Sequence, residues 1–106
     1  MKKSTTILIT GGKGLLGSAI SRNLIKKKYI KVLCPSSKKL NLLDFKQCDN
    51  YFKKNKPEVI YHCANVVYGI TGNYNNGFKV LNNNLLLNTN ILLLANKYKI
   101  KNFIFI

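Results

Sequence analysis

Apolar and polar positions follow one another along the chain in blocks that predict four strands and three helices. Short runs of apolar and β-branched residues predict buried strands at 5–10, 29–34, 59–64 and 102–106. Between these runs, apolar residues recur at helical spacing over 15–28, 45–55 and 78–98. The segment 65–77 is rich in glycine and asparagine, and it is predicted to be a loop.

The predicted order is therefore β-α-β-α-β-α-β. Strands without polar alternation, separated by helices, are typical of a parallel sheet that is covered on both faces. We expect an α/β fold of the Rossmann-like, doubly wound class, with right-handed crossovers. No internal repeat or domain boundary interrupts residues 1–106. Because the last residues read as a core strand, we expect the chain to be the N-terminal part of a longer cofactor-binding domain, without a substrate domain.

Length and composition narrow the class of protein. The 106 residues, of which 46% are hydrophobic, suit one small globular domain. No apolar run reaches the roughly 18–20 residues that span a bilayer, and the short run after the first lysines does not suit a secretion signal. The cysteines Cys34, Cys48 and Cys63 form no CxxC, and His62 is the one histidine. We therefore expect no disulfide framework, no metal site and a cytoplasmic location.

The formal net charge of +15 raises the question of an anionic partner. Of the 18 basic residues, all but Arg22 are lysines, and they are spread along the chain. Base readout favours the bidentate fork of arginine, so nucleic acid is disfavoured as a partner. Joint enrichment in lysine and asparagine is typical of a biased composition on a solvated surface. A polyanion-binding surface is the alternative interpretation.

A glycine-rich turn at Thr10 to Gly17, TGGKGLLG, is the most specific signal. It follows a predicted strand and opens a predicted helix, which is the setting of a dinucleotide-binding turn, and it lacks the GK[ST] ending of a P-loop. Gly11 would allow the sharp turn, Gly14 would let the pyrophosphate approach, and Gly17 would let helix and strand pack closely. The candidate cofactor contacts in this turn are Gly11, Gly12, Lys13, Gly14, Leu15, Leu16 and Gly17. A glycine-rich turn without a ligand is the alternative.

The end of the second predicted strand indicates which dinucleotide would bind. An Asp or Glu about 20 residues after the glycines would hold the ribose 2′-OH of NAD. Here the chain reads CPSSKK over 34–39, with no carboxylate. Hydroxyl and ammonium groups suit a 2′-phosphate, so we expect NADP, with Lys38 and either Ser37 or Lys39 at that phosphate. Solvated surface lysines are the alternative.

These motifs resemble those of the extended short-chain dehydrogenases/reductases, within the NAD-dependent epimerase/dehydratases. The turn at 10–17 is shared by many nucleotide-sugar epimerases and reductases. Other segments narrow the resemblance to the GDP-L-fucose synthases, and together they cover nearly all of this chain but only the first third of a typical member. These segments are LNLLD at 40–44, KPEVIYHCA at 56–64, VYGI at 67–70, NLLLNTNI at 84–91 and KIKNFIF at 99–105.

The resemblance implies a cofactor site and an activity. In that family the glycine turn binds the pyrophosphate, and the segment 37–42 wraps the adenosine end. Asn41 and Leu42 stand where the family contacts the adenine, and Ala64 stands beside the cofactor. The family's enzymes epimerise C3 and C5 of GDP-4-keto-6-deoxy-D-mannose and reduce its C4 ketone with hydride from NADPH. A GDP-linked nucleotide-sugar substrate and a homodimer packed through the helix 78–98 are also implied.

The sequence departs from the family pattern near the substrate side. Asn65 stands where the family usually has a second alanine, and the segment 66–69 lacks the usual lysine and one of the glycines. The family's catalytic Ser or Thr, its Tyr-x-x-x-Lys pair and its epimerising Cys and His follow the fourth strand, so we expect them beyond Ile106. We assign no catalytic residue within 1–106. We expect this chain alone to bind cofactor weakly, to catalyse nothing and to dissolve poorly, because part of its apolar surface would be uncovered.

Three alternative functions remain open. The chain could belong to another extended nucleotide-sugar enzyme, such as a 4-epimerase or a 4,6-dehydratase, or to a non-catalytic NADP-binding regulator. The sequence downstream would separate these two. A basic nucleic-acid-binding module is the third, and DNA affinity with a steep salt dependence would favour it.

The remaining chemistry-bearing residues are expected to be structural. His62 and Cys63 are adjacent in a predicted strand, so their side chains point to opposite faces and cannot form a nucleophile–base pair. We expect both to pack in the core, because a free cysteine behaves as a small hydrophobe. Asn84 and Asn90 are likewise expected to support the long helix.

Overall fold

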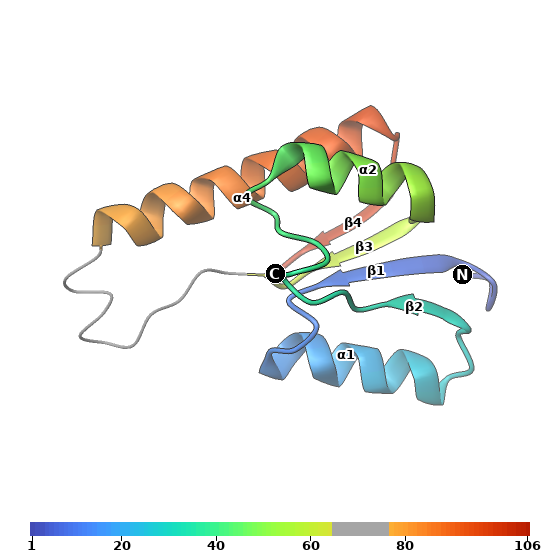
Figure 1. Ribbon diagram of the computed structural model, residues 1–106. Helices are drawn as coiled ribbons and strands as arrows, with labels where there is room; N and C mark the ends of the chain where they lie inside the picture. The colour runs from blue at the N-terminus through green and yellow to red at the C-terminus, as the bar shows by residue number, and fades with distance from the viewer. Residues whose placement is uncertain (65–76) are drawn as a thin grey trace.

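The computed structural model describes residues 1–64 and 77–106 of the chain. These residues form four parallel strands and three helices on the two sides of one sheet (Figure 1). In chain order the elements are β1 Thr6–Thr10, α1 Leu15–Lys26, β2 Lys31–Leu33, α2 Phe45–Asn55, β3 Val59–His62, α4 Gly77–Lys97 and β4 Asn102–Phe105. The predicted loop at 65–77, the family motif at 67–70 and the departures at 65–69 lie outside the described residues, apart from Gly77.

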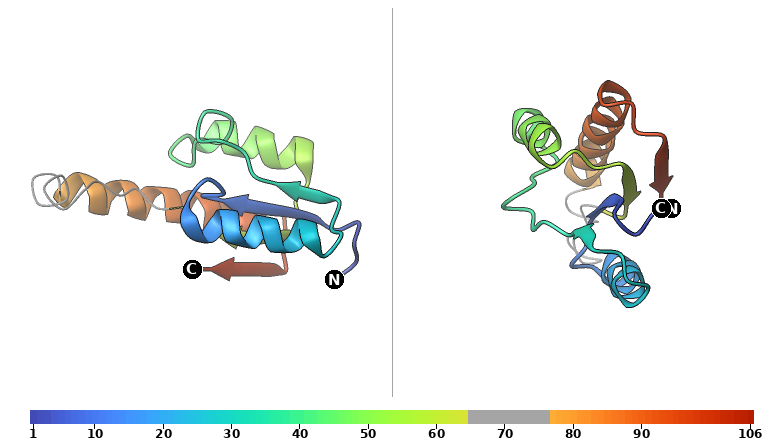
Figure 2. Two further views of the ribbon diagram at one scale, coloured as in Figure 1. Left: turned by 90° about the horizontal axis from the view of Figure 1, so that it is seen from below. Right: turned by 90° about the vertical axis from the view of Figure 1, so that its right-hand side faces the viewer.

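The strands are ordered β2-β1-β3-β4, and all three pairings are parallel. Helix α1 covers one face of this sheet, and α2 and α4 cover the other, as the end-on view in Figure 2 shows. The expected α/β, doubly wound, Rossmann-like fold is therefore confirmed for the described part of the chain. Parallel strands that are covered on both faces explain why their sequences lack polar alternation.

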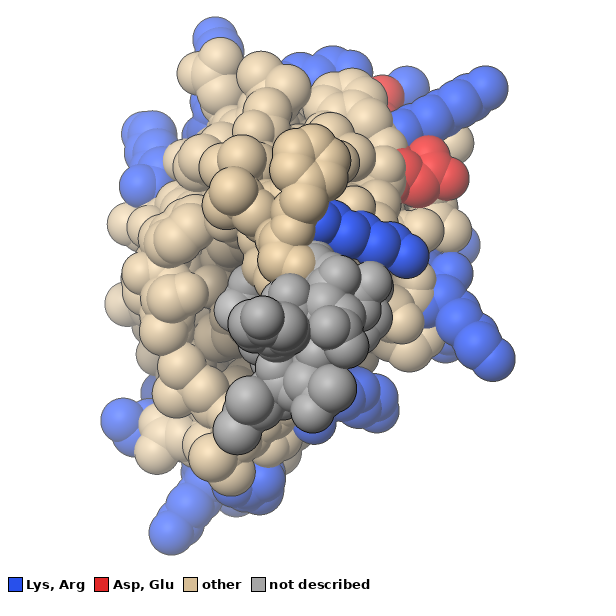
Figure 3. Space-filling view, turned by 90° about the vertical axis from the view of Figure 1, so that its left-hand side faces the viewer, with Lys and Arg blue, Asp and Glu red and all other residues tan. Residues whose placement is uncertain are grey.

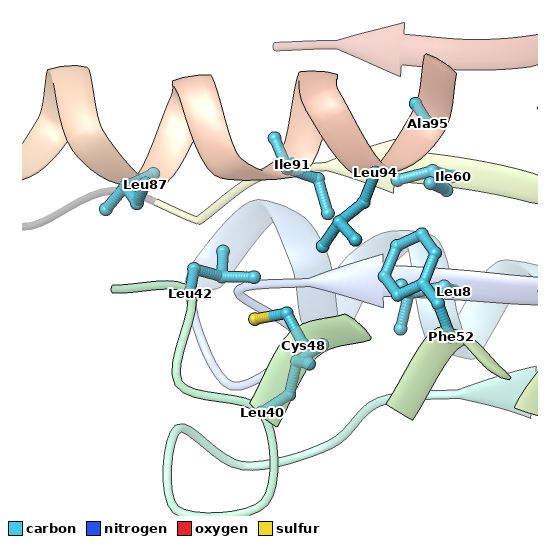
Figure 4. Packing of buried hydrophobic residues seen from close by; sticks show 10 residues of the cluster. All are labelled: Leu8, Leu40, Leu42, Cys48, Phe52, Ile60, Leu87, Ile91, Leu94 and Ala95. Atoms are coloured by element: carbon cyan, nitrogen blue, oxygen red, sulfur yellow. The ribbon is translucent and has the colours of Figure 1, made fainter. Parts of the chain in front are cut away.

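The core is split by the sheet into two clusters. The larger lies between the sheet, α2 and α4, where Leu8 and Ile60 from the strands meet Phe52, Ile91 and Leu94 from the helices (Figure 4). The smaller lies beneath α1, where Ile7 and Ile9 pack against Leu24 and Val59. Alternate residues of β1 thus serve opposite faces, which fixes the register of the central strand.

Strand β2 is shorter than the predicted strand at 29–34. The N–H of Tyr29 donates to the carbonyl of Leu24 at the end of α1, and the N–H of Ile30 donates to the carbonyl of Lys3. Lys28, with φ 73°, turns the chain just before them. The backbone of 29–30 is therefore used to close the helix and to hold the N-terminal segment, and only Lys31–Leu33 pairs with β1.

Two apolar surfaces remain exposed. On α4 they include Phe78, which is 85% exposed, together with Leu81 and Leu85. On β4, an edge of the sheet, Phe105 and the following Ile106 are each more than half exposed. Poor solubility in isolation therefore stays a prediction with a visible structural reason. None of the helices in the described residues has the length and apolarity needed to cross a bilayer.

Candidate functional site

A cavity of about 270 Å³ opens at the carboxyl ends of β1 and β3. This is the edge at which open α/β sheets bind their ligands. The residues that line it come from the glycine turn, the segment after β2, the end of β3 and helix α4. They are Thr10, Gly11, Gly12, Lys13, Gly14, Pro35, Ser37, Leu40, Leu42, Ala64 and Leu87.

The glycine turn is built from positions that do not accept a side chain. Gly11 has φ 67°, and a Cβ there would lie 2.8 Å from the backbone of Ala64. A Cβ on Gly17 would collide with the carbonyl of Gly11, and one on Gly12 would lie 2.9 Å from Cβ of Cys34. The turn therefore packs directly against β3, the start of α1 and the end of β2. Gly11 makes the sharp turn that its position predicts, with its positive φ. Gly17 is required by close packing too, but its near neighbours are Gly11 and Gly12 of the turn and not the strand that was predicted.

Gly14 differs from the other three glycines of the turn. Its φ of −76° and ψ of 174° are accessible to any residue. A Cβ there would meet one atom within 4 Å, the carbonyl oxygen of Gly11 at 3.4 Å. The fold does not require glycine at this position, whereas a ligand that approached the backbone closely would.

The amino end of α1 has no cap of its own. Gly14 is the N-cap residue and has no side chain that could accept from the first N–H groups, and no acid lies in the first turn. By contrast, the carboxylate of Asp44 accepts from the N–H of Gln47 at the start of α2. Free N–H groups and the positive end of the helix dipole at the rim of a cavity suit an anion, so this arrangement fits a dinucleotide pyrophosphate.

The segment after β2 forms an apolar wall of the cavity, and a hydrogen bond from α4 fixes its backbone. Leu40 and Leu42 are 5% and 8% exposed and line the cavity with Ser37. The buried amide of Asn90 on α4 donates to the carbonyl of Leu42 at 2.8 Å. The structural role expected for Asn90 is therefore to fix this wall.

Two of the predicted contacts, Asn41 and Lys38, lie outside the cavity lining. The side chain of Asn41 accepts from the N–H of Leu43, and its carbonyl accepts from the thiol of Cys48. Lys38 lies beside Lys39 in an open groove between β2 and α2, next to the cavity but outside its lining. The Gln47 side chain holds this loop by accepting from the N–H of Asn41 and donating to the carbonyl of Lys38. Leu15, Leu16 and Gly17 also lie outside the lining.

Four lining residues are not among the candidate contacts: Pro35 and Leu87, and also Thr10 and Leu40, which belong to the turn at 10–17 and to the segment 37–42. Thr10 could have been found, because it is the last residue of the strand that leads into the glycine turn. Leu87 reaches the cavity from α4, and no local pattern signals such a tertiary contact.

The ionisable groups near the cavity are few. Lys13 is the one charged residue among the described lining residues. Behind the wall, burial lowers the pKa of His62 and raises the pKa of Cys63, so both are neutral near pH 7. No group of three potential metal ligands occurs within 1–64 and 77–106. The described part of the cavity is thus equipped to bind and orient a ligand.

The surface around the cavity carries positive charge. Figure 3 views the molecule from the side toward which the strands of Figure 1 point, and lysine and arginine side chains ring this face while acidic ones are sparse. A net charge of +15 raises the local concentration of anionic ligands and speeds their arrival.

Residues 7–106 match the NAD dependent epimerase/dehydratase family, and the chain belongs to that family. Its relatives include GDP-sugar synthases, as the motifs predicted. The chain is 39% identical over 95 residues to a GDP-L-colitose synthase of Yersinia pseudotuberculosis, and the match covers 90% of this chain and 30% of that protein. It is 35% identical over 100 residues to a probable GDP-L-fucose synthase of Drosophila melanogaster, with 92% and 30% covered.

A solved structure supports the same placement. The fold superposes with a TM-score of 0.83 and 27% identity on a GDP-L-fucose synthetase from Naegleria fowleri bound to NADP, covering 99% of this chain and 31% of that one. The chain therefore spans about 30% of the length of the curated relatives it matches.

Proposed function

We propose that residues 1–106 form the NADP-binding part of a nucleotide-sugar enzyme that epimerises and reduces a GDP-linked 4-keto sugar, as a GDP-L-fucose synthase does. The observation that carries this proposal is the uncapped amino end of α1 at the rim of a cavity whose glycine turn leaves room for a diphosphate. NADPH would supply the hydride for reduction of the C4 ketone. The residues of this chain would bind the cofactor and orient it.

Each part of the cavity has a proposed task. The N–H groups of Gly12, Lys13 and Leu15 and the charge of Lys13 would hold the pyrophosphate. The N–H of Gly14 donates within the turn, to the carbonyl of Gly11 at 3.0 Å. Leu40 and Leu42 would pack against the adenine, with Asn41 fixing the loop behind them. Ala64, at the end of β3, would lie beside the nicotinamide half.

The 2′-phosphate would lie at the end of β2. Ser37 lines the cavity, and Lys38 and Lys39 flank it from the neighbouring groove. A lysine side chain is long enough and has enough rotatable bonds to swing from the groove toward a phosphate. Tighter binding of NADPH than of NADH would support this assignment, and equal affinity would contradict it.

The chemistry of the whole enzyme is proposed to depend on sequence that follows Ile106. In the proposed enzyme, a Ser or Thr, a Tyr-x-x-x-Lys pair and the Cys and His of the epimerisation would follow there. A homodimer through α4 is part of the same proposal, and the exposed Phe78, Leu81 and Leu85 support it.

A second GDP sugar is a candidate substrate. The chain is slightly more similar to the GDP-L-colitose synthase than to the GDP-L-fucose synthase, so the GDP sugar handled by the former is the alternative substrate. Turnover of GDP-4-keto-6-deoxy-D-mannose by the protein extended through its downstream sequence would favour the fucose reaction. Failure to use it, with NADPH binding intact, would favour the alternative.

The cofactor proposal is tested with Gly14→Ala. The backbone at Gly14 tolerates alanine and the added methyl group meets only one carbonyl oxygen, so the variant is expected to fold. Its methyl group would stand where the pyrophosphate approaches. In an NMR titration of the 106-residue chain, NADPH should shift the amide signals of the glycine turn and of Ala64. We expect affinity in the variant to fall about tenfold or more, equivalent to at least about 1.4 kcal/mol.

Gly77→Ala is the matched control, because a Cβ there meets no atom of the described residues within 4 Å and the residue is remote from the glycine turn in sequence. It should bind NADPH as the natural chain does. An absence of NADPH-induced shifts at millimolar cofactor, or equal binding by Gly14→Ala, would contradict the proposed function.

A further inference from the structure

The buried histidine behind the cavity is bonded on both ring nitrogens. His62, the last residue of β3, is 1% exposed. Its Nδ1 lies 2.6 Å from Oγ1 of Thr10, and its Nε2 lies 2.7 Å from Oδ1 of Asn88 on α4. The side chain therefore connects β1, β3 and α4 at the level where the cavity begins.

The hydroxyl of Thr10 decides which nitrogen carries the proton. Oγ1 accepts from the N–H of Cys63 at 3.1 Å and from the N–H of Ala64 at 3.2 Å. A hydroxyl has two acceptor positions and one donor, so these two bonds leave its proton for Nδ1 of His62. Nδ1 is then an acceptor, and Nε2–H donates to Asn88. The bonding pattern selects the neutral Nε2–H tautomer.

The same hydroxyl belongs to the cavity wall. Thr10 and Ala64 both line the cavity, whereas His62 lies behind them. We propose that His62 is a positioning residue of the cofactor site: by accepting the Thr10 proton, it keeps the threonine oxygen free to hold the backbone of Cys63 and Ala64 at the wall. This inference rests on the proposed cofactor function.

Protonation of the ring would undo this arrangement. Nδ1–H would then point at Oγ1 of Thr10, which could no longer accept from both backbone N–H groups. The N–H of Cys63 also donates to the main-chain carbonyl of Thr10 at 3.2 Å, so the N–H of Ala64 is the group that would lose its acceptor. The groups packed on the ring are Thr10 from β1, Asn88 from α4, and Phe103 and Phe105 from β4, and none of them is charged. The neighbouring thiol of Cys63 packs in the cluster on the other face of the sheet and stays neutral. Within 1–64 and 77–106, therefore, none of these contacts supplies a carboxylate to stabilise an imidazolium.

Two substitutions distinguish the hydrogen bond at Nδ1 of His62 from the one at Nε2. In His62→Asn the amide oxygen occupies nearly the position of Nδ1 and can accept from Thr10, but it does not reach Asn88. In His62→Gln the amide nitrogen occupies nearly the position of Nε2 and can donate to Asn88, but the acceptor for Thr10 is lost. Both variants remove the aromatic ring, so a purely structural role would affect them alike.

The first measurement needs no ligand. Because the chain has one histidine, long-range ¹H–¹⁵N NMR spectra report its tautomer without ambiguity. We expect the Nε2–H form, and amide hydrogen exchange at Ala64 that is about tenfold faster in His62→Gln than in His62→Asn, as the loss of one buried hydrogen bond implies. An Nδ1–H tautomer, or equal exchange in the two variants, would overturn the inference.

The second measurement is NADPH affinity at pH 7.5 and pH 5.5. At pH 7.5 we expect His62→Gln to bind NADPH about tenfold more weakly than His62→Asn, because the asparagine restores an acceptor for the Thr10 hydroxyl. Because burial lowers the pKa of His62, the ring should stay neutral below its ordinary titration range. The titration of the 2′-phosphate itself cancels when the natural chain is compared with His62→Asn at each pH. Equal affinities of His62→Gln and His62→Asn at pH 7.5 would contradict the positioning role. If no protein binds NADPH, the proposed function fails, whereas the tautomer and exchange data still decide whether His62 holds the wall.

Discussion

At the scale of single residues, the site is defined by where side chains are absent. Gly11 and Gly17 lie against neighbouring backbone, and Gly12 lies against Cys34. At each of these positions an added Cβ would force the neighbouring atoms to move. Gly14 alone is free of that constraint, and it faces the cavity. This difference separates the glycines that the fold needs from the one that a ligand would need.

Cys48 provides a residue-scale prediction. Its thiol is fully buried on α2, and burial, helped by the nearby carboxylate of Asp44, raises its pKa to about 11 from 9.0. At pH 8 the reactive thiolate is then about a hundredfold scarcer than in an unperturbed cysteine. We expect iodoacetamide to label Cys48 at least about a hundredfold more slowly in the native chain than in urea, measured by peptide mass spectrometry.

Unfolding supplies the control for this prediction, since all three cysteines should react alike in urea. The same pKa shift predicts how the stability of the fold changes with pH. The unfolded thiol ionises first, so the part of the stability that comes from the neutral Cys48 is present below pH 9 and declines as the pH rises toward 11. Rapid native-state labelling of Cys48 would show that the core around α2 opens readily.

At the scale of elements, the contrast between two helix starts carries the functional argument. Helix α2 begins with a carboxylate cap, and α1 begins with glycine and no cap. A helix that serves only structure gains from a cap, whereas a helix end that binds an anion must leave its N–H groups free. The position of the uncapped end at the cavity is therefore consistent with a ligand in that place.

Asp44→Ala tests the cap of α2. The Oδ1 of Asp44 accepts from the N–H of Gln47 at 3.1 Å, and removal of such a cap typically costs about 1 kcal/mol. We expect the free energy of unfolding in urea to fall by about that amount. Asp44→Asn keeps an acceptor at the same place and should lose much less; an equal loss in both variants would show that the charge, and not the hydrogen bond, stabilises the helix.

Local sequence patterns are sufficient for most elements and for part of the site. Buried strands and amphipathic helices have characteristic spacings, and the glycine turn is a local motif, so their positions follow from the sequence. The length of β2 does not, because the backbone of Tyr29 and Ile30 bonds to Leu24 and Lys3. The position of Leu87 in the lining, and of Asn41 and Lys38 outside it, also does not follow from local pattern. Leu87 comes from α4, and the Gln47 side chain of α2 bonds the backbone of Asn41 and Lys38.

At the scale of the whole molecule, charge is the dominant feature. Eighteen basic residues face three acids, and all three acids are engaged: Asp49 pairs with Lys97 at 2.8 Å, Glu58 accepts from the N–H of Thr6, and Asp44 accepts from the N–H of Gln47. Such an excess attracts anionic ligands, but it also repels itself in the compact state. Salt should therefore stabilise this fold.

Thermal melting in increasing sodium chloride tests this consequence. Going from about 10 mM to about 100 mM salt shortens the screening length from about 30 Å to about 10 Å. If the relieved repulsion is about 1 kcal/mol, Tm should rise by about 4–8 °C for a chain of this size. A Tm that is flat or falls with salt would show that the lysines are too well solvated to strain the fold.

A charge-reversed variant is the companion experiment. Lys46→Glu with Lys79→Glu lowers the net charge by four, from +15 to +11, and places acids in the first turns of α2 and α4, where the helix dipole favours them. We expect a higher Tm at low salt and a weaker salt dependence. Both residues are exposed, so packing should not change.

The open start of α1 also governs how this protein should be handled at the bench. Phosphate and sulfate buffers offer the same tetrahedral oxygens that a diphosphate would present, and they would compete for those N–H groups. Any oxyanion held there would raise the melting point of a nominally empty sample and weaken the apparent cofactor affinity by mass action. Preparations in Tris or HEPES with chloride as the counter-ion would report the intrinsic values.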